Sequence, residues 1–212
     1  NPVFQSYDTS LCFIWAVQQY FKVYQKPRKI WRNYGDAIKE ILNSFGKSKT
    51  SGISLTKEGL VLADKERIAL TWMNSYVNGI PVVQRDGIAV EINALWFNAI
   101  CFALEIADMV GDEPFIEKWR GMVKKVGTAF NTTFWNEGHE HLADVVKKGI
   151  PDWSVRPNMI IAAAMDFTPL SKEQQKLVLS VAKRKLLTKR GLRTLSPDHL
   201  RYKGVVEGGP NE

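Results

Sequence analysis

LTWMNSYVNGIPVVQRDGIAVEINALWFN, residues 70–98, joins a turn-rich segment to an apolar run that carries one carboxylate, Glu91. The part before the apolar run holds an indole, an amide and a guanidinium, from Trp72, Asn74 and Arg85. Aromatic faces stack on the C–H faces of sugar rings, and amides and carboxylates form hydrogen bonds with sugar hydroxyls. The stretch therefore points to a carbohydrate site beside a buried helix.

The apolar run predicts a helix over residues 90–110, and this helix should lie inside the fold because it has little polar surface. Glu91 and Asn98 are seven positions apart and share one of its faces. Buried polar groups need partners. The two side chains are therefore either satisfied core residues or the lining of a polar cavity. A stop at Gly111 and a restart at Pro114 predict a second helix over 113–134, which completes an αα-hairpin.

Hydrophobic periodicity predicts four more helices, over residues 11–25, 29–45, 159–165 and 171–188. The helix over 11–25 is apolar nearly all round, which predicts cover on both sides, whereas the helix over 29–45 has a single apolar stripe. Asp8 is placed to cap the first of them, residues 171–174 fit a capping box for the last, and Gly191 should end it. Residues 46–54 should form a loop, and short strands are expected at 60–63, 68–72 and 142–146. The predicted class is all-α, built from αα-hairpins with short β-hairpins in the connecting segments.

Composition narrows the classes of function. The chain has 212 residues, which suits one domain or a large part of one, and a formal net charge of +7. Lys and Arg concentrate in residues 118–125, 147–148 and 172–193, where solvated helix faces explain them better than a nucleic-acid surface. No run approaches the roughly 18 apolar residues of a membrane span. We therefore expect neither a nucleic-acid partner nor a membrane partner.

The cysteines and histidines predict no metal site and no cofactor. Cys12 and Cys101 lie in apolar runs without ligand spacing, so buried free thiols are expected, as in a reducing, cytoplasmic setting. His139 and His141 alternate and should share one face of a strand. No further ligand accompanies them, so we interpret them as hairpin histidines.

Six short motifs carry a family resemblance. The chain resembles the amylo-α-1,6-glucosidase domain of prokaryotic-type glycogen debranching enzymes, whose motif order it follows along nearly its whole length: YDTSLCF at 7–13, TWM at 71–73, VEINALWFNA at 90–99, FWNE at 134–137, RPN at 156–158 and GLRTLSP at 191–197. The resemblance implies an (α/α)6 toroid. Residues 1–212 would be part of one such domain, apparently truncated at both ends.

The resemblance also implies an activity and a partner. The expected reaction is hydrolysis of α-1,6-linked glucose at the branch points of glycogen or limit dextrin, with an α-glucan oligosaccharide or glycogen as the partner. Inversion would use two carboxyl groups about 6.5–9.5 Å apart, one as acid and one as base. By the family motifs Asp8 and Asn158 join Trp72 and Arg85 as substrate-binding candidates, and the general base would lie beyond Glu212.

The motif departs from the family at its acid position. The family's general acid is commonly the Asp after Thr-Trp-Met, and here that position is Asn74. An amide cannot donate a proton as an acid does. Three explanations of Asn74 remain open: another carboxyl acts as the acid, the motif has drifted in sequence, or Asn was substituted for Asp to trap a complex. Glu91 is the nearest carboxylate within the motif, and we favour it for site architecture before acid catalysis; Asn74 and Glu91 are the catalytic candidates.

Three classes of function remain open: an α-1,6-glucosidase or part of one, a non-catalytic carbohydrate-binding relative, which Asn74 favours, and a helical interaction scaffold. For the first two, we expect the candidate residues to converge at one end of the helical arc, namely Asp8, Trp72, Asn74, Arg85, Glu91 and Asn158. Truncation should leave apolar surface uncovered around Trp96 and Phe102, which would favour a homo-oligomer.

Overall fold

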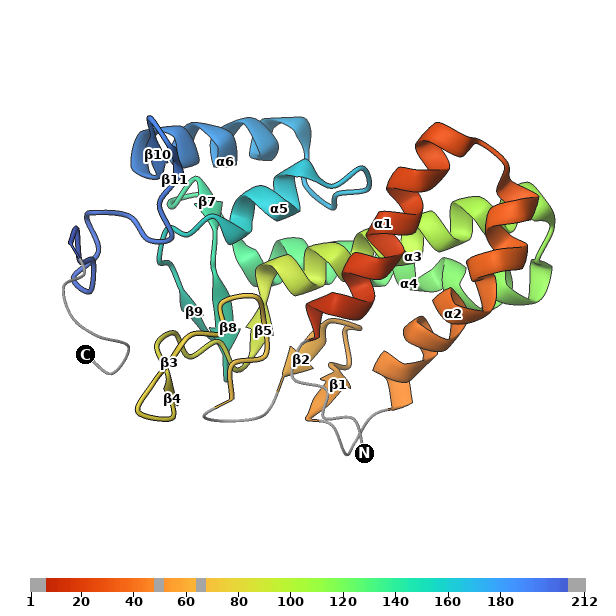
Figure 1. Ribbon diagram of the computed structural model, residues 1–212, viewed down its shortest axis with the longest axis horizontal. Coiled ribbons are helices and arrows are strands. Elements are labelled where there is room, and N and C mark those ends of the chain that lie inside the picture. The colour runs from red at the N-terminus through yellow and green to blue at the C-terminus, as the bar shows by residue number, and fades with distance from the viewer. Residues whose placement is uncertain (1–6, 48–51, 64–67, 206–212) are drawn as a thin grey trace.

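A computed structural model describes residues 7–47, 52–63 and 68–205 (Figure 1). This part of the chain is mostly helical with short strands, as predicted. Its helices are α1 Asp8–Tyr24, α2 Pro27–Lys47, α3 Val90–Val110, α4 Glu113–Phe134, α5 Asn158–Ala164 and α6 Lys172–Lys185. Successive helices pack as pairs, α1 on α2, α3 on α4 and α5 on α6.

Helix α3 is the centre of the fold (Figure 1), and it contacts α1, α2, α4 and α5. Both α3 and α4 have the predicted bounds. Gly111 ends α3 in the left-handed region, at φ 76°, and Asp112 caps α4 by accepting a hydrogen bond from the Phe115 N–H. Asp112 also accepts from the Trp31 indole at 3.0 Å, which ties α2 to the link between α3 and α4.

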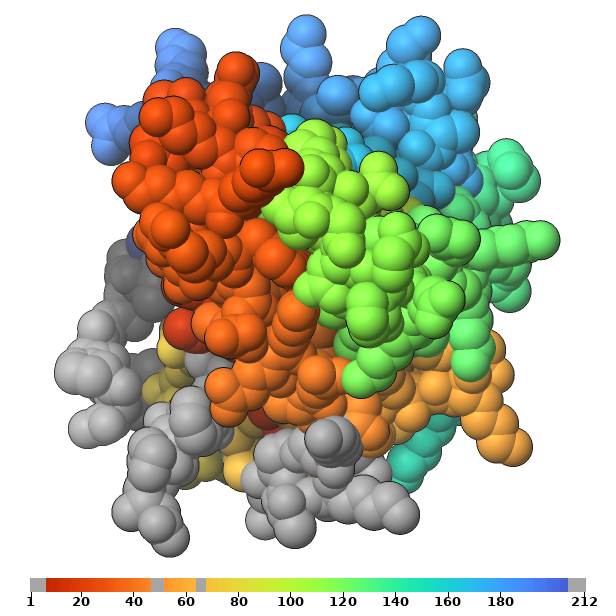
Figure 2. Space-filling model, turned by 90° about the vertical axis from the view of Figure 1, so that its right-hand side faces the viewer, coloured from red at the N-terminus to blue at the C-terminus, as the bar shows by residue number. Residues whose placement is uncertain are grey.

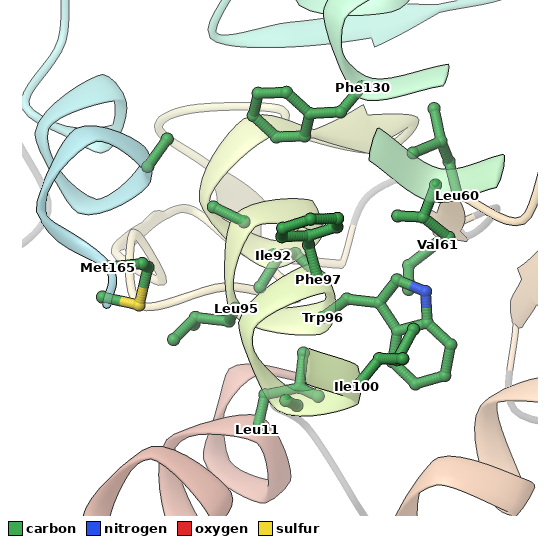
Figure 3. Close-up of a cluster of buried hydrophobic side chains, with 14 of the residues drawn as sticks. Leu11, Leu60, Val61, Ile92, Leu95, Trp96, Phe97, Ile100, Phe130 and Met165 are labelled. Atoms are coloured by element: carbon green, nitrogen blue, oxygen red, sulfur yellow. The ribbon is translucent and has the colours of Figure 1, made fainter. Parts of the chain in front are cut away.

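The core packs around the apolar face of α3 (Figure 3), where Trp96 is enclosed beside Leu60 and Val61. Its indole N–H donates to the Gly59 carbonyl at 3.0 Å, so the buried donor is satisfied. The expectation that Trp96 and Phe102 would be uncovered is wrong, because both side chains are fully buried by the surrounding helices.

Helix α1 is covered on one side only, which corrects the prediction of cover on both sides. Leu11, Ile14 and Val17 face the core, but large apolar side chains on the other side are exposed, namely Phe13, Trp15, Tyr20 and Val23. Figure 2 views the end of the molecule where α1 and α2 lie beside the link between α3 and α4. Cys12 belongs to the exposed side and Cys101 is partly buried, so the expectation of two buried thiols is also wrong.

The start of α1 differs from the prediction as well. Tyr7 occupies the N-cap position without a side-chain cap, and Asp8 is the first residue of the helix rather than its cap. Its carboxylate still lies in the first turn, where the helix dipole favours a negative charge. At the other end of the chain the predicted capping box is confirmed, with Ser171 and Gln174 bonding reciprocally at the start of α6.

The short strands form five small antiparallel sheets within the described residues. They pair as β1 Ile53–Leu55 with β2 Val61–Ala63, β3 Tyr76–Val77 with β4 Ile80–Pro81, β5 Ile88–Ala89 with β8 Val145–Lys147, β8 with β9 Ile150–Asp152, β6 Trp135–Asn136 with β7 His141–Leu142, and β10 Leu187–Thr188 with β11 Gly191–Leu192.

Several predicted boundaries change. Residues 46–54 are not one loop, because α2 extends to Lys47 and β1 begins at Ile53. Residues 142–146 divide between β7 and β8, because the amides of Ala143 and Asp144 donate to other partners, Phe134 O and Asp152 O. Helix α6 ends at Lys185, before Gly191, because β10 and β11 follow it as a hairpin.

Residues 68–72 do not form the predicted strand. The Leu70 carbonyl accepts from the Tyr7 N–H at 3.0 Å, and the Ala69 N–H donates to the Tyr76 hydroxyl at 2.7 Å. These partners occupy groups that a strand ladder would use, so strand β2 pairs with β1 instead. Residues 64–67, which connect the predicted strands at 60–63 and 68–72, lie outside the described residues.

The sheet of β5, β8 and β9 leads directly into α3. Gly87 comes just before β5 with φ 128°, and a Cβ on it would lie 2.6 Å from the Val146 carbonyl oxygen. A side chain at this position is therefore excluded both by conformation and by space. The close approach holds the chain next to β8 just before it enters α3.

Helix α3 is also the one helix of the described residues that is long and apolar enough to cross a membrane by length and composition. In the fold 83% of its most apolar window is buried, as in the core helix of a globular domain. This is weak evidence for a membrane span.

Candidate functional site

The candidate site is organised around the buried guanidinium of Arg85, which lies between β4 and β5. Its Nη2 donates to Glu91 Oε2 at 2.6 Å and its Nη1 donates to Glu91 Oε1, a bidentate pair. Its Nε donates to Asp144 Oδ2 at 2.9 Å, and the same Nη2 donates to the Asp144 carbonyl at 3.0 Å. Nη1 also donates to Thr71 Oγ1 at 3.2 Å. All five donors of the guanidinium are therefore used.

The buried charges of Arg85 and of its carboxylate partners shift one another's pKa values. Burial alone would lower the pKa of Arg85, but the carboxylates of Glu91 and Asp144 outweigh it and raise the pKa. Burial raises the pKa of Glu91, and the Arg85 guanidinium opposes that shift. Because Glu91 is fully buried and both its oxygens accept from Arg85, its carboxyl has no direct route to a bound ligand.

Asp144 joins this cluster to the predicted sugar-binding residues. It is 3% exposed, and its Oδ1 accepts from Asn158 Nδ2 at 2.7 Å. Arg156 lies on its other side, with Nε 3.7 Å from Asp144 Oδ2 and Nη1 donating to the Thr194 carbonyl at 3.3 Å. Burial lowers the pKa of Arg156, and the nearby Asp144 charge partly offsets this.

Sequence reasoning missed Asp144, although a signal was available. The residue stands in the apolar run Leu142–Val146, and a carboxylate in a buried strand needs a charged partner. The position of that partner, Arg85, is 59 residues earlier in the chain. Only the folded arrangement shows that the two belong together.

The Trp72 indole is held in place although much of it faces solvent. Its Nε1 donates to Asn158 Oδ1 at 2.8 Å, while the side chain as a whole is 43% exposed. Asn158 is fully buried at the start of α5, and its Nδ2 also lies 3.4 Å from the sulfur of Met73. A partly exposed indole therefore has its N–H fixed by a buried amide.

A cavity of about 910 Å³ is lined by Met73, the residue that follows Trp72 in the chain. Its wall also includes Arg156, which neighbours Asp144 in space. Residues of the segment after β11, among them Thr194 and Tyr202, also line it. The volume is in the range that ligand sites use, and the wall contains both polar and apolar side chains.

Four of the six predicted site residues are brought together. Trp72, Arg85, Glu91 and Asn158 form one continuous network through Asp144. Asp8 lies at the start of α1 and follows Tyr7, whose N–H is bonded to Leu70, so the first turn of α1 abuts the segment that leads to Trp72.

Asn74 is not part of the network. The residue is exposed in the loop after Met73, and its side chain makes no hydrogen bond within the described part of the chain. It stands near the cavity by sequence, since Met73 lines it.

Asn98 does not join this site either, although it shares a face of α3 with Glu91. Its Nδ2 donates to Gln18 Oε1 at 2.7 Å, and its Oδ1 accepts from the Phe167 N–H at 3.1 Å. Asn98 is thus a satisfied core residue that ties α3 to α1, which selects one of the two interpretations of this face.

The histidine pair packs on an aromatic ring. His139 stacks on Trp153 with ring centroids 4.0 Å apart, and His141 meets the same ring edge-on. His139 lies in the turn before β7 rather than within a strand. Over residues 7–47, 52–63 and 68–205, no group of three or more His, Cys, Asp or Glu side chains is placed to hold a metal ion.

Comparison with known proteins assigns the chain a family and a fold. The family model described as amylo-alpha-1,6-glucosidase matches residues 1–212. Among solved structures, a rhamnosidase from Klebsiella oxytoca with rhamnose bound is similar, with a TM-score of 0.58 at 9% sequence identity. The match covers 84% of this chain and 30% of that protein, so the chain spans less than a third of its length. At this identity the likeness shows the fold alone.

Proposed function

The chain belongs to the amylo-alpha-1,6-glucosidase family, and from this premise we propose that it is part of a domain that cleaves α-1,6-glucosidic branch linkages. At the coarser level it is a glycoside hydrolase-like domain. The proposed substrate is glycogen, limit dextrin or an α-glucan oligosaccharide derived from them.

One observation carries the proposal: the half-exposed Trp72 indole is fixed by buried Asn158, and the next residue in the chain, Met73, lines the 910 Å³ cavity. An oriented indole offers an apolar platform for the C–H face of a glucose ring, and a preorganised platform loses little entropy on binding. The cavity wall supplies hydroxyl, amide and guanidinium groups for the sugar hydroxyls, among them Gln84, Ser154 and Arg156.

We propose that the helices form an arc of an (α/α)6 toroid. The contacts α1–α3 and α3–α5 link the first helices of successive pairs side by side, as in the inner layer of a toroid. Each of these helices has a more apolar sequence than its partner in the pair, and α3 is buried almost all round. The candidate site lies at the N-terminal ends of α3 and α5, from which Glu91 and Asn158 extend into it.

The proposed mechanism is inversion by a carboxylic acid and a carboxylate base. In this chain the family's acid position is Asn74, so Glu91 serves site architecture by holding Arg85. The described carboxylates that line the cavity are Asp152 and Asp198. Asp152 accepts from the Ser154 N–H and hydroxyl, and an ion pair with Lys185 lowers the pKa of Asp198.

From the amide at the acid position and the environment of the cavity carboxylates, we propose that the 212-residue chain alone does not hydrolyse α-1,6-glucosidic bonds. The amide of Asn74 cannot act as a general acid, and the lowered pKa of Asp198 disfavours the protonated form that a general acid needs near neutral pH. The test is glucose release from a branched limit dextrin by the 212-residue chain and by the full-length parent. Robust turnover by the 212-residue chain alone would refute the proposed inactivity, and no turnover by the parent would refute the hydrolase assignment.

A non-catalytic carbohydrate-binding relative is the second candidate, and the exposed amide at the acid position favours it. Both candidates require the cavity to bind sugar, so the parent's turnover separates them. Isothermal titration with panose, which carries one α-1,6 linkage, and with maltotriose, which carries none, tests the shared requirement.

A further inference from the structure

Trp72 is anchored by an amide whose orientation is itself decided by another residue. An indole N–H can only donate, so it needs the oxygen of the Asn158 amide and not its nitrogen. The Nδ2 end of that amide faces Asp144 Oδ1 at 2.7 Å, and the Oδ1 end faces the indole at 2.8 Å. If the amide were flipped, two donors would meet at Trp72 and two acceptors would meet at Asp144. The carboxylate of Asp144 therefore selects the orientation that suits the indole.

Asp144 is in turn held from several directions. Arg85 donates both to its carboxylate and to its carbonyl, and the Val90 N–H donates to the same carbonyl at 3.1 Å. The Arg156 guanidinium lies 3.7 Å away and adds a second positive charge. Two buried guanidiniums therefore flank this carboxylate, and the hydrogen bond from Arg85 keeps its acceptor oxygens in place.

The chain of contacts closes on itself. Arg85 also donates to Thr71, the residue directly before Trp72. The backbone beside the indole and the N–H of the indole are thus both fixed by groups that Arg85 and Asp144 organise. Thr71 and Asp144 are buried, whereas Trp72 is 43% exposed and directly precedes Met73 of the cavity wall.

We propose that Asp144 is a positioning residue for sugar binding: by fixing the Asn158 amide it sets the plane of the Trp72 indole against which a pyranose ring stacks. The inference rests on the proposed function, in which the cavity binds an α-glucan. Asp144 contacts no substrate in this arrangement and acts only through Asn158.

The first experiment follows the indole without any ligand. In a 1H–15N spectrum of the full chain, Trp72→Phe identifies the Trp72 Nε1–H resonance by its disappearance. Asp144→Asn removes the charge that orients the amide, so this resonance should move and exchange faster with water while those of the other tryptophans stay in place. The matched control is Asp166→Asn, which removes a surface carboxylate that pairs with Lys22. An unmoved Trp72 resonance in folded Asp144→Asn overturns the proposal.

The second experiment is a double-mutant cycle on panose binding. Asp144→Asn should raise the Kd by roughly 3- to 10-fold when Trp72 is present, and by much less in the Trp72→Phe background, because phenylalanine has no N–H to orient. Equal losses in both backgrounds would indicate a general structural role and would overturn the proposal.

Two further outcomes are distinguishable. If Asp144→Asn fails to fold, Asn158→Leu removes the acceptor of the Trp72 N–H and leaves the ion pair of Asp144 with Arg85 intact. An unmoved Trp72 resonance in that variant overturns the proposal. If the resonance moves as expected but the wild-type chain and its parent bind neither panose nor maltotriose, the sugar-binding function fails and the positioning of the indole stands alone. In that case the proposal that the indole is positioned for stacking on a sugar ring is overturned.

Discussion

The Trp72 indole N–H and the Asn158 amide oxygen are 2.8 Å apart although 86 positions separate them in the chain. One residue belongs to an irregular loop and the other begins α5. A solvent-facing indole seldom needs a buried protein acceptor, since water can serve it. The pairing therefore indicates that the fold fixes the orientation of this ring as well as its location.

Replacing Trp72 by alanine should weaken panose binding by about tenfold or more while lowering the free energy of unfolding only modestly, because the ring is half-exposed. Titration calorimetry and urea unfolding measure the two effects. Trp15→Ala is the matched control, since Trp15 is similarly exposed, at 40%, but lies on α1. Equal binding by both variants would contradict the assignment of Trp72.

Glu91→Gln should lower the free energy of unfolding by about 3–5 kcal/mol, because it leaves the buried Arg85 guanidinium without its bidentate partner. Urea unfolding checks the loss. The control is Glu117→Gln on the exposed face of α4, where a change within about 0.5 kcal/mol is expected. An unchanged free energy of unfolding in Glu91→Gln would mean that the ion pair is not needed to hold Arg85.

Asn74→Asp in the full-length parent should raise the rate of glucose release from limit dextrin by about 10²–10⁴-fold if this position supplies the acid. Asn78→Asp is the control, because Asn78 is another exposed amide, in the turn between β3 and β4. An active parent that gains nothing from Asn74→Asp would place the acid on another carboxyl, with Asp152 of the cavity wall the first to test.

Alkaline pH should destabilise the fold in part through Cys101. Burial raises the pKa of this thiol from its usual 9.0 to about 12, so the folded state favours the protonated form. This contribution is fully present below pH 9, where both states hold the proton, and is lost as the pH rises toward about 12. Urea unfolding of the wild type and of Cys101→Ala between pH 8 and 11 tests the sign. The variant should lose less stability over that interval, and equal slopes would contradict the shift.

Self-association should depend on the exposed apolar face of α1. Trp15→Glu places a charge on that face and should shift the chain toward monomer in sedimentation velocity, since large apolar patches favour association. Leu179→Glu on α6 is the control, because Leu179 is also exposed but lies on another helix. A chain that is monomeric before substitution would contradict the homo-oligomer proposed here.

The sequence was sufficient for elements whose signals are local. Helices α3 and α4 have the predicted bounds because a Gly stop, an Asp cap and a Pro restart follow one another at residues 111–114. The predicted strand at 68–72 failed because its backbone partners, Tyr7 and the Tyr76 side chain, come from outside any ladder. Local propensity contains no information on such partners.

The site was predictable in part for the same reason. Trp72, Glu91 and Asn158 lie in the family motifs, Arg85 lies between two of these motifs, and the structure joins all four residues. Asp144 lies in no such motif, and its role depends on contacts with Arg85 and Asn158 that only the tertiary fold creates. The exposed side of α1 was mispredicted because amphipathicity shows which residues are apolar, but not how many neighbours are available to cover them.

The wide spacing of the Arg85 contacts has a consequence for the order of folding. Asp144 lies 59 residues after Arg85 in the chain. If Arg85 were buried before Asp144 had folded next to it, its guanidinium would lack one of its two carboxylate partners, and the Trp72 indole would lack its acceptor, Asn158. We predict that during synthesis the loop at 71–85 stays open until the chain has passed residue 158, and that it closes in one cooperative step with α5. Pulse-labelling hydrogen exchange would then show the Trp72 indole gaining protection together with the α5 amides, later than the amides of α3, and protection of the indole at the same time as α3 would refute this order.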